Sequence, residues 1–275
     1  MCLAGSPRTL TLHHVIHALF THLMSGLNAT IDILAVFDRA DAWSKKQTGW
    51  SFGSVNPPTE RVQHVLGRLQ PRAVTFWEPL SAGVRVGQKL VTNATRCKTT
   101  GFIQTEDNLD RALAQVASWT SCLTTVEILE KRQGVPYDLF LRTRPDLLWL
   151  GPHPPACSFT SGIAYTRSSF PDQHFIVPRA VAATFSSDML KAYLRCPSGR
   201  LQSRTGWDVT GLTKWIERVA PSRKFPFPAV IVRSNASSES ADVLCFDVTQ
   251  RNPSLNLTTE QCMRRAYPMC PAGGC

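Results

Sequence analysis

Residues 137–149 read YDLFLRTRPDLLW, an apolar segment that delivers two arginines and an aspartate to its end. The part up to Arg142 has the length and the aromatic content of a buried β-strand. The longest predicted helix, residues 106–132, precedes it and is terminated by Gly134. Because strands separated by single helices are typical of βαβ units, this segment predicts an α/β fold with a mainly parallel central sheet flanked by helices.

The same alternation of strands and helices continues along the chain. Further strands are predicted at residues 1–4, 31–37, 73–77, 161–165, 173–177 and 228–233, and further helices at residues 12–27, 59–70, 179–194 and 207–219. Hydrophobic residues make up 43% of the 275 residues, which is enough for a substantial core. We therefore expect an α/β domain over residues 1–235 and a cysteine-containing tail, residues 236–275, packed on it.

The charge of the chain bears on its partners. Thirty Lys and Arg residues against twenty Asp and Glu residues give a net charge of +10. The basic residues are scattered and form no stripe, so we expect no nucleic-acid partner. A basic surface also suits an anionic small molecule such as a sugar nucleotide.

Cysteine and asparagine usage point to a cellular compartment. The chain has nine cysteines and no CxxC pair, and four N-x-S/T acceptor sequences at Asn28, Asn93, Asn235 and Asn256, where chance predicts roughly one. Both features favour the Golgi or endoplasmic reticulum lumen, or secretion, over the cytoplasm. We expect glycosylation at Asn235 above all. The alternative is a cytosolic protein whose cysteines form no disulfides and have no specific role.

A secretory compartment also leads to expectations about the disulfides and about the N-terminus of the chain. We expect at least two disulfides, involving Cys262, Cys270 and Cys275, and a free thiol at Cys2 on the first strand. The first predicted strand begins at residue 1 without a recognisable signal peptide. We interpret this as a missing N-terminal anchor or signal, which would be the only connection to a membrane.

Candidate ligand-binding residues follow the predicted strands, because open α/β sheets bind ligands beyond the carboxyl ends of their strands. These positions hold Gly5, Arg8, Asp38, Arg142, Arg144 and Asp146. Strand alternation would place Arg142 and Arg144 on one face, where they could bind a diphosphate in bidentate fashion. Asp146 could bind a divalent cation. The alternative is a purely structural role, in which Arg142 and Asp146 pair with each other or cap the next turn.

The segment YDLFLRTRPDLLW resembles the Y-D-x-x-x-R-x-R-P-D signature of GT-A-type glycosyltransferase-like proteins. Other elements of that group follow in the same order: CLAGSPRT at residues 2–9 resembles its C-x-x-G-x-x-R-T opening, residues 31–37 its second strand, and DQHFIVPR at residues 172–179 its D-x-x-x-x-V-P-R element. The resemblance covers residues 1–235. It implies a Rossmann-like GT-A nucleotide-diphospho-sugar transferase fold.

The resemblance also implies roles for single residues. Gly5 and Arg8 would lie near the nucleotide diphosphate and Asp38 near the base or ribose. Asp146 would take the place of an acidic ligand to Mn²⁺ or Mg²⁺, and Asp172 would lie close to the acceptor. GT-A enzymes commonly carry Asp-x-Asp at the position of Asp146, but two leucines follow here.

This departure leaves two sources of countercharge open, a metal at Asp146 or the arginines Arg142 and Arg144. A carboxylate must also deprotonate the acceptor hydroxyl in an inverting transfer, and Asp172 and Asp208 are both candidates. For Asp208 the alternative is a charge that stabilises the start of a helix.

The sequence therefore predicts a glycosyltransferase, of hexosyltransferase type, that moves a sugar from a nucleotide-sugar donor to a hydroxyl of a glycan or glycoprotein acceptor. A non-catalytic relative of the same fold that binds carbohydrate or nucleotide is the alternative, and the missing second aspartate supports it.

Overall fold

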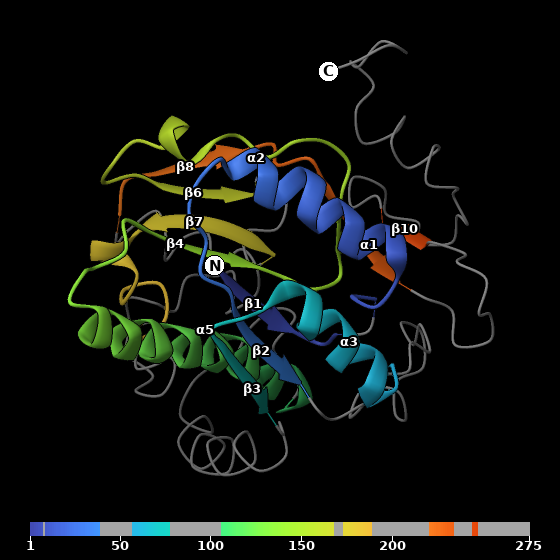
Figure 1. Cartoon of the computed structure of the whole chain (residues 1–275). Helices are drawn as coiled ribbons and strands as arrows, with labels where there is room; N and C mark the ends of the chain where they lie inside the picture. Colours follow the sequence, from blue (N-terminus) through green and yellow to red (C-terminus); the bar gives the residue numbers. More distant parts are fainter. Residues whose placement is uncertain are drawn as a thin grey trace.

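The computed structural model describes residues 1–7, 9–38, 57–77, 106–167, 173–188, 220–233 and 244–246. Its main sheet has seven strands in the order β3-β2-β1-β4-β7-β6-β8 (Figure 1). The strands are β1 (Cys2–Gly5), β2 (Leu34–Asp38), β3 (Ala73–Trp77), β4 (Leu139–Thr143), β6 (Ala164–Arg167), β7 (His174–Pro178) and β8 (Ser222–Phe225). All neighbours pair in parallel except β7, which is antiparallel to both β4 and β6. The predicted α/β fold with a mostly parallel sheet is confirmed.

A second, three-stranded sheet is antiparallel throughout. It consists of β5 (Leu147–Trp149), β9 (Ala229–Arg233) and β10 (Leu244–Phe246), with β9 in the centre. The strand β10 belongs to the stretch that the sequence predicts as a tail, and β5 follows β4 after a short turn. Because β5 pairs with β9, this small sheet joins the end of the YDLFLRTRPDLLW segment to residues 229–231.

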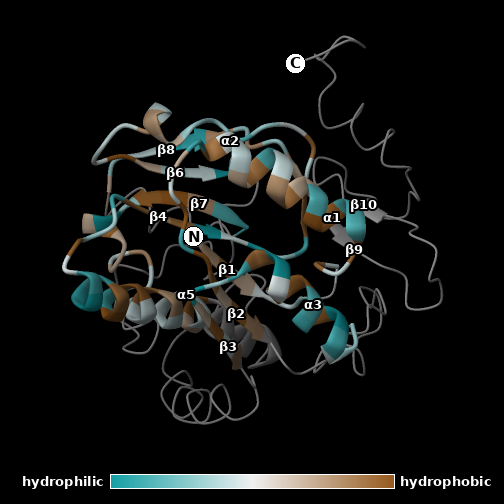
Figure 2. Ribbon diagram, in the orientation of Figure 1, coloured by the Kyte–Doolittle hydropathy of each residue, from teal (hydrophilic) through white to brown (hydrophobic). Residues whose placement is uncertain are grey.

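Helices cover both faces of the main sheet (Figure 1). They are α1 (His13–Ala18), the π-helix η1 (Leu19–Met24), α2 (Ser25–Leu27), α3 (Thr59–Leu69) and α5 (Glu106–Gln133), with short 3₁₀ turns η3 (Ala156–Ser158) and η4 (Arg179–Val181). One core cluster joins the sheet to α1, η1 and α3, and another joins it to α5. The central strands carry the apolar residues, and the outer sides of α1 and α3 are hydrophilic (Figure 2).

Successive residues of β1 pack alternately into the two core clusters. Leu3 packs into the cluster with α1 and α3, whereas Cys2 and Ala4 pack into the cluster with α5. This follows from the two-residue period of a strand, since a strand buried on both faces needs apolar residues at every position. The first predicted strand is therefore central, as its uninterrupted apolar sequence indicates.

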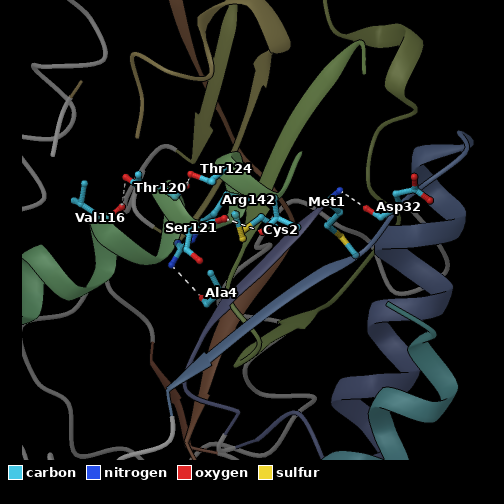
Figure 3. Close-up of a disulfide and its surroundings, with 11 residues drawn as sticks. Met1, Cys2, Ala4, Asp32, Val116, Thr120, Ser121, Thr124 and Arg142 are labelled. Carbon is cyan, nitrogen blue, oxygen red and sulfur yellow. Dashed lines mark hydrogen bonds between the residues drawn. A yellow bond between two sulfur atoms is a disulfide. The ribbon is translucent and has the colours of Figure 1, made fainter. Parts of the chain in front are cut away.

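A buried disulfide joins β1 to α5. Cys2 and Cys122 are bonded, with their Cα atoms 5.9 Å apart and both residues fully buried (Figure 3). The prediction that Cys2 stays a free thiol is therefore wrong, because α5 packs over β1 and brings Cys122 to it. Cys157 is a free, exposed thiol. The cysteines predicted to form disulfides, Cys262, Cys270 and Cys275, lie outside the described residues.

The segment from His13 to Leu27 confirms the predicted helix 12–27, but its middle is wider than an α-helix. In the π-helix η1, the carbonyl of His22 accepts a hydrogen bond from the backbone N–H of His153, at 2.8 Å. A Cβ on Gly26 would lie 2.5 Å from the carbonyl oxygen of His153. Glycine at position 26 therefore allows the chain after β5 to cross the helix at contact distance.

Two predicted elements differ from the structure. Within the predicted helix 179–194, residues 179–186 form η4 and a series of turns, residues 187 and 188 are helical, and the remainder lies outside the described residues. The hydroxyls of Ser186 and Ser187 donate to carbonyls four residues earlier, which competes with regular helix formation. The predicted strand 161–165 begins later, at Ala164, because Gly162 occupies a turn with a φ of +84°.

Candidate functional site

The strand order reverses between β1 and β4. β1 pairs with β2 on one side and β4 on the other, all in parallel, with Cys2 opposite Arg142 and Leu3 opposite Thr143. The carboxyl ends of β1 and β4 therefore meet at the same edge of the sheet. Open α/β sheets bind their ligands at such a switch point, so Gly5 and residues 144–146 occupy the position where a ligand is expected.

Gly5 and Pro145 are in contact at this edge. Gly5 has a φ of +135°, a conformation that favours glycine, and a Cβ there would lie 3.4 Å from Cδ of Pro145. The end of CLAG and the turn of RTRPD are thus packed together, although 140 positions separate Gly5 from Pro145. The structure brings together two motifs that the sequence analysis connected only by their order.

Arg144 and Asp146 form a bidentate ion pair at the same edge. Nε and Nη2 of Arg144 donate to the two carboxylate oxygens of Asp146, each at 2.7 Å. The Asp146 side chain is 2% exposed and that of Arg144 25%. The backbone N–H of Arg144 also donates to the carbonyl of Gln173. Both oxygens of Asp146 therefore already accept strong, charge-assisted hydrogen bonds.

Arg142 lies in the interior and not on the edge. Its Nη2 donates to the carbonyl of Ala4 at 3.3 Å (Figure 3). Its guanidinium lies 5.0 Å from the ring of Trp119 on α5, and the residue is 1% exposed. The expected common face of Arg142 and Arg144 does not form. Strand alternation ends with β4 at Thr143, and the chain then turns at Pro145.

The antiparallel strand β7 contributes further groups, because its beginning lies beside the end of β4. Thr143 is opposite His174, and Gln173 directly precedes the strand. Arg167, at the end of β6, donates hydrogen bonds to the side chain of Gln173 and to the carbonyl of Ala229. Sequence reasoning missed Arg167, although its place at the end of a short β-rich segment was a usable signal.

A buried histidine pair lies next to these groups. Nε2 of His153 and Nε2 of His174 are 3.2 Å apart, and Nδ1 of His153 is 2.7 Å from the carbonyl of Pro154. One consistent tautomer has His174 donating to His153 and His153 donating to Pro154. Burial lowers the pKa of His153 to about 4, and burial followed by repulsion from His153 and the nearby arginines lowers that of His174 well below its usual value.

Both histidines are therefore neutral at neutral pH, so the charge at this edge comes from other side chains. Arg144 and Arg167 lie here, Arg142 lies just beneath, and Asp146 is the carboxylate that the structure describes among them. The described part of the edge has an excess of positive charge. Such an environment favours an anion over a cation.

The other predicted site residues are only partly covered by the structure. Asp38 ends β2 at the same sheet edge, opposite Trp77, and only its backbone is described. Arg8, Asp172 and Asp208 lie outside the described residues, as does Asn235. The described residues therefore bring together Gly5, Arg144 and Asp146, and they separate Arg142 from them.

The first part of YDLFLRTRPDLLW has a structural role at the opposite edge of the sheet. The hydroxyl of Tyr137 donates to the carboxylate of Asp32 at 2.5 Å, which lowers the pKa of Asp32. Burial, together with this bond, raises the pKa of Tyr137 to about 12. These contacts attach the start of β4 to the segment that leads into β2.

Arg179 extends these contacts to the long helix. It binds both carboxylate oxygens of Glu130 on α5, at 2.8 and 2.7 Å, and its backbone N–H donates to the carbonyl of Asp138. Glu127, also on α5, is half exposed, and its Oε1 lies 3.7 Å from Nη2 of Arg179. These contacts join the start of β4, the end of β7 and α5 at this edge of the sheet.

Comparisons with known proteins add no identification. The sequence matches no protein-family model and no curated protein sequence. Within the described ranges, no three His, Cys, Asp or Glu side chains are grouped so that they could hold a metal ion. No helix in the described part of the chain is long and apolar enough to cross a membrane.

Proposed function

We propose that the chain is a GT-A-type glycosyltransferase that moves a sugar from a nucleotide-sugar donor to a hydroxyl acceptor in the secretory pathway. The contact between Gly5 and the Arg144-Pro145-Asp146 turn, at the switch point of a mostly parallel sheet, is the observation that carries the proposal. Sheets of this kind bind nucleotides at that position. The arginines of the same edge suit the charge of a diphosphate.

In this proposal the described residues stabilise the leaving nucleoside diphosphate. A guanidinium positioned before the reaction can stabilise the negative charge that develops on the diphosphate as the bond between its oxygen and the anomeric carbon of the sugar breaks. Arg144 is the partly exposed arginine next to Gly5 and takes this role. The absence of a Cβ at Gly5 lets the phosphate approach the backbone closely. Arg8 and Asp38 remain predictions for the diphosphate and the ribose.

The buried position of Arg142 supports an indirect role. Its bond to the carbonyl of Ala4 holds the residue that precedes Gly5, and its charge lies below the switch point. Arg142 therefore positions the end of β1 and contributes to the positive potential there. Deprotonation of the acceptor hydroxyl is left to Asp172 or Asp208, which remain predictions.

The described residues fit Mn²⁺ or Mg²⁺ poorly. A divalent cation at Asp146 would compete with the Arg144 guanidinium for both carboxylate oxygens, and the two leucines that follow offer no second ligand. Countercharge from arginine is the better supported of the two possibilities, so we assign no step of the reaction to a metal.

A non-catalytic carbohydrate- or nucleotide-binding relative is the second candidate. The closed Arg144–Asp146 pair favours it, because both side chains satisfy each other in the absence of a ligand. Binding of UDP-sugars without transfer or hydrolysis of the sugar would support this candidate over the enzyme.

The test compares two arginine–carboxylate pairs at opposite edges of the sheet. Arg144→Ala should weaken the binding of a nucleotide sugar by about 1.5–3 kcal/mol, the usual contribution of a hydrogen bond to a charged group. Arg179→Ala is the matched control, since Arg179 makes the same bidentate contact with Glu130 at the other edge. Its nucleotide affinity should equal that of the wild type.

Titration calorimetry with UDP-sugars and GDP-sugars, and urea unfolding of the same proteins, separate binding from stability. Both variants leave a carboxylate without its guanidinium, so both should unfold more easily. The double variant Arg144→Met/Asp146→Leu removes the pair without that buried charge and should still bind weakly. Wild-type nucleotide affinity in folded Arg144→Ala and in the double variant would refute the proposed role of this edge.

A further inference from the structure

The acceptor sequence Asn28-Ala29-Thr30 lies on the surface, directly after helix α2. All three residues are exposed. Asn28 caps the helix in the left-handed conformation, with φ 46° and ψ 51°, while the preceding Leu27 is buried in the core. The fold therefore anchors the chain just before Asn28 and leaves the N-x-T triplet itself outside the packed interior.

The cap alone does not account for this triplet. Asparagine is common in left-handed helix caps, which would explain Asn28 without any modification. However, helix α3 ends in the same left-handed conformation at Gln70, with φ 45°. A left-handed helix cap in this fold therefore does not require asparagine. The exposed Thr30 two positions later has no part in the cap, and it completes the acceptor sequence.

The position of Asn28 in the fold is compatible with a bulky group. Helices α1 to α2 lead from the carboxyl end of β1 back to the beginning of β2, so Asn28 lies at the edge of the sheet opposite Gly5 (Figure 1). A glycan at Asn28 would extend into solvent without covering the switch point. The buried Cys2–Cys122 disulfide independently favours an oxidising compartment, where such glycans are added.

We propose that Asn28 is N-glycosylated. The co-reactant is a lipid-diphosphate-linked oligosaccharide, supplied with its transferase by the secretory membrane. A bond forms between Nδ2 of Asn28 and C1 of the first sugar, the bond between C1 and the phosphate oxygen breaks, and the lipid diphosphate leaves. The Nδ2 nitrogen loses one proton to a base of that transferase, and no group is oxidised or reduced.

The test uses the full chain expressed behind a cleavable signal peptide in cultured animal cells. Tryptic peptide 9–39 contains Asn28 as its only asparagine. Release of the glycan by peptide-N-glycosidase in heavy-oxygen water should convert Asn28 to a heavy-oxygen aspartate in this peptide. Asn252, which is followed by proline, should carry no such label and serves as the internal control.

Two variants separate the glycan from the helix cap. Thr30→Ala removes the acceptor hydroxyl and keeps the cap, whereas Asn28→Gly removes the acceptor and keeps a residue suited to positive φ. Each variant should migrate faster on a gel than the wild type, by a shift that corresponds to the mass of one glycan. This difference should vanish after enzymatic deglycosylation.

The label is read in both secreted and cell-retained protein, because transfer occurs as the chain enters the compartment. An unlabelled Asn28 overturns the proposal, whether or not the protein contains the Cys2–Cys122 disulfide. Neither result bears on nucleotide binding, so the transferase proposal is tested separately.

Discussion

Removal of the Cys2–Cys122 disulfide should destabilise the protein strongly. The bond joins the central strand β1 to α5 across 120 residues, and both cysteines are fully buried. In the chain-entropy model, a closed loop of this length lowers the entropy of the unfolded chain by about 16 cal/mol/K, which is about 5 kcal/mol at 25 °C. Whole domains are stable by about 5–15 kcal/mol, so the loss should be a large part of the total.

The perturbation is the double variant Cys2→Ala/Cys122→Ala, which leaves no single thiol behind. The exposed, free Cys157 provides the matched control, and Cys157→Ala should change the free energy of unfolding by less than about 0.5 kcal/mol. Urea titrations without reductant give the free energy for both variants and the wild type. We expect the double variant to lose about 2–5 kcal/mol, the usual range for a native disulfide.

Thiol mapping checks the bond itself. In the native protein without reductant, a maleimide should label Cys157, and a non-reduced digest should contain the peptides of Cys2 and Cys122 joined together. Labelling of both Cys2 and Cys122 after unfolding without reductant would refute the disulfide. A double variant as stable as Cys157→Ala would refute the energetic argument.

Two further predictions concern the crossing of the helix and the histidine pair. Gly26→Ala should destabilise the protein by about 1–3 kcal/mol, because the new Cβ would collide with the backbone of His153. Gly67→Ala has open space around its Cβ and should stabilise the protein by about 0.5–1 kcal/mol. Equal melting temperatures of the two variants would contradict this prediction. The pKa of His153 is about 4 in the folded protein, against an ordinary value of 6.5. Between these two pH values the unfolded state binds more protons than the folded state. The free energy of unfolding should therefore fall by about 3 kcal/mol from pH 7 to pH 4. Urea titrations across this range measure the fall, and a value independent of pH between 7 and 5 would exclude a neutral His153–His174 pair.

Local patterns in the sequence predicted most of the elements that carry the candidate site. Residues 73–77 form a strand with the predicted bounds, and α3 and the long helix α5 lie where helical spacing indicated. These segments are determined locally, because the period of apolar residues shows which side of a strand or helix faces the core. The same reasoning identified Gly5, Arg144 and Asp146 as residues that follow strands.

The direction of β7 and the existence of β5 could not be predicted in this way. The strand β7 is buried at every position, and a strand buried on both faces has the same sequence pattern in parallel and antiparallel pairing. β5 is three residues long and continues the apolar run of β4 after a short turn. Because β7 runs antiparallel, its start lies at the switch point, which is why Gln173 and His174 belong to the candidate site.

By itself, the sequence determined the α/β class, the alternation of elements and the residues that end each strand, since these depend on neighbours within a few positions. The partners of those residues were decided only by the tertiary structure. Cys2 meets Cys122, Arg142 meets the carbonyl of Ala4 138 positions away, and Tyr137 meets Asp32 105 positions away. Sequence periodicity carries no information about such pairings, because it shows which face is buried but not which distant segment packs against it. Arg142 and Arg144 are two positions apart, yet the packing of α5 buries one beside Trp119 while the turn at Pro145 directs the other to Asp146.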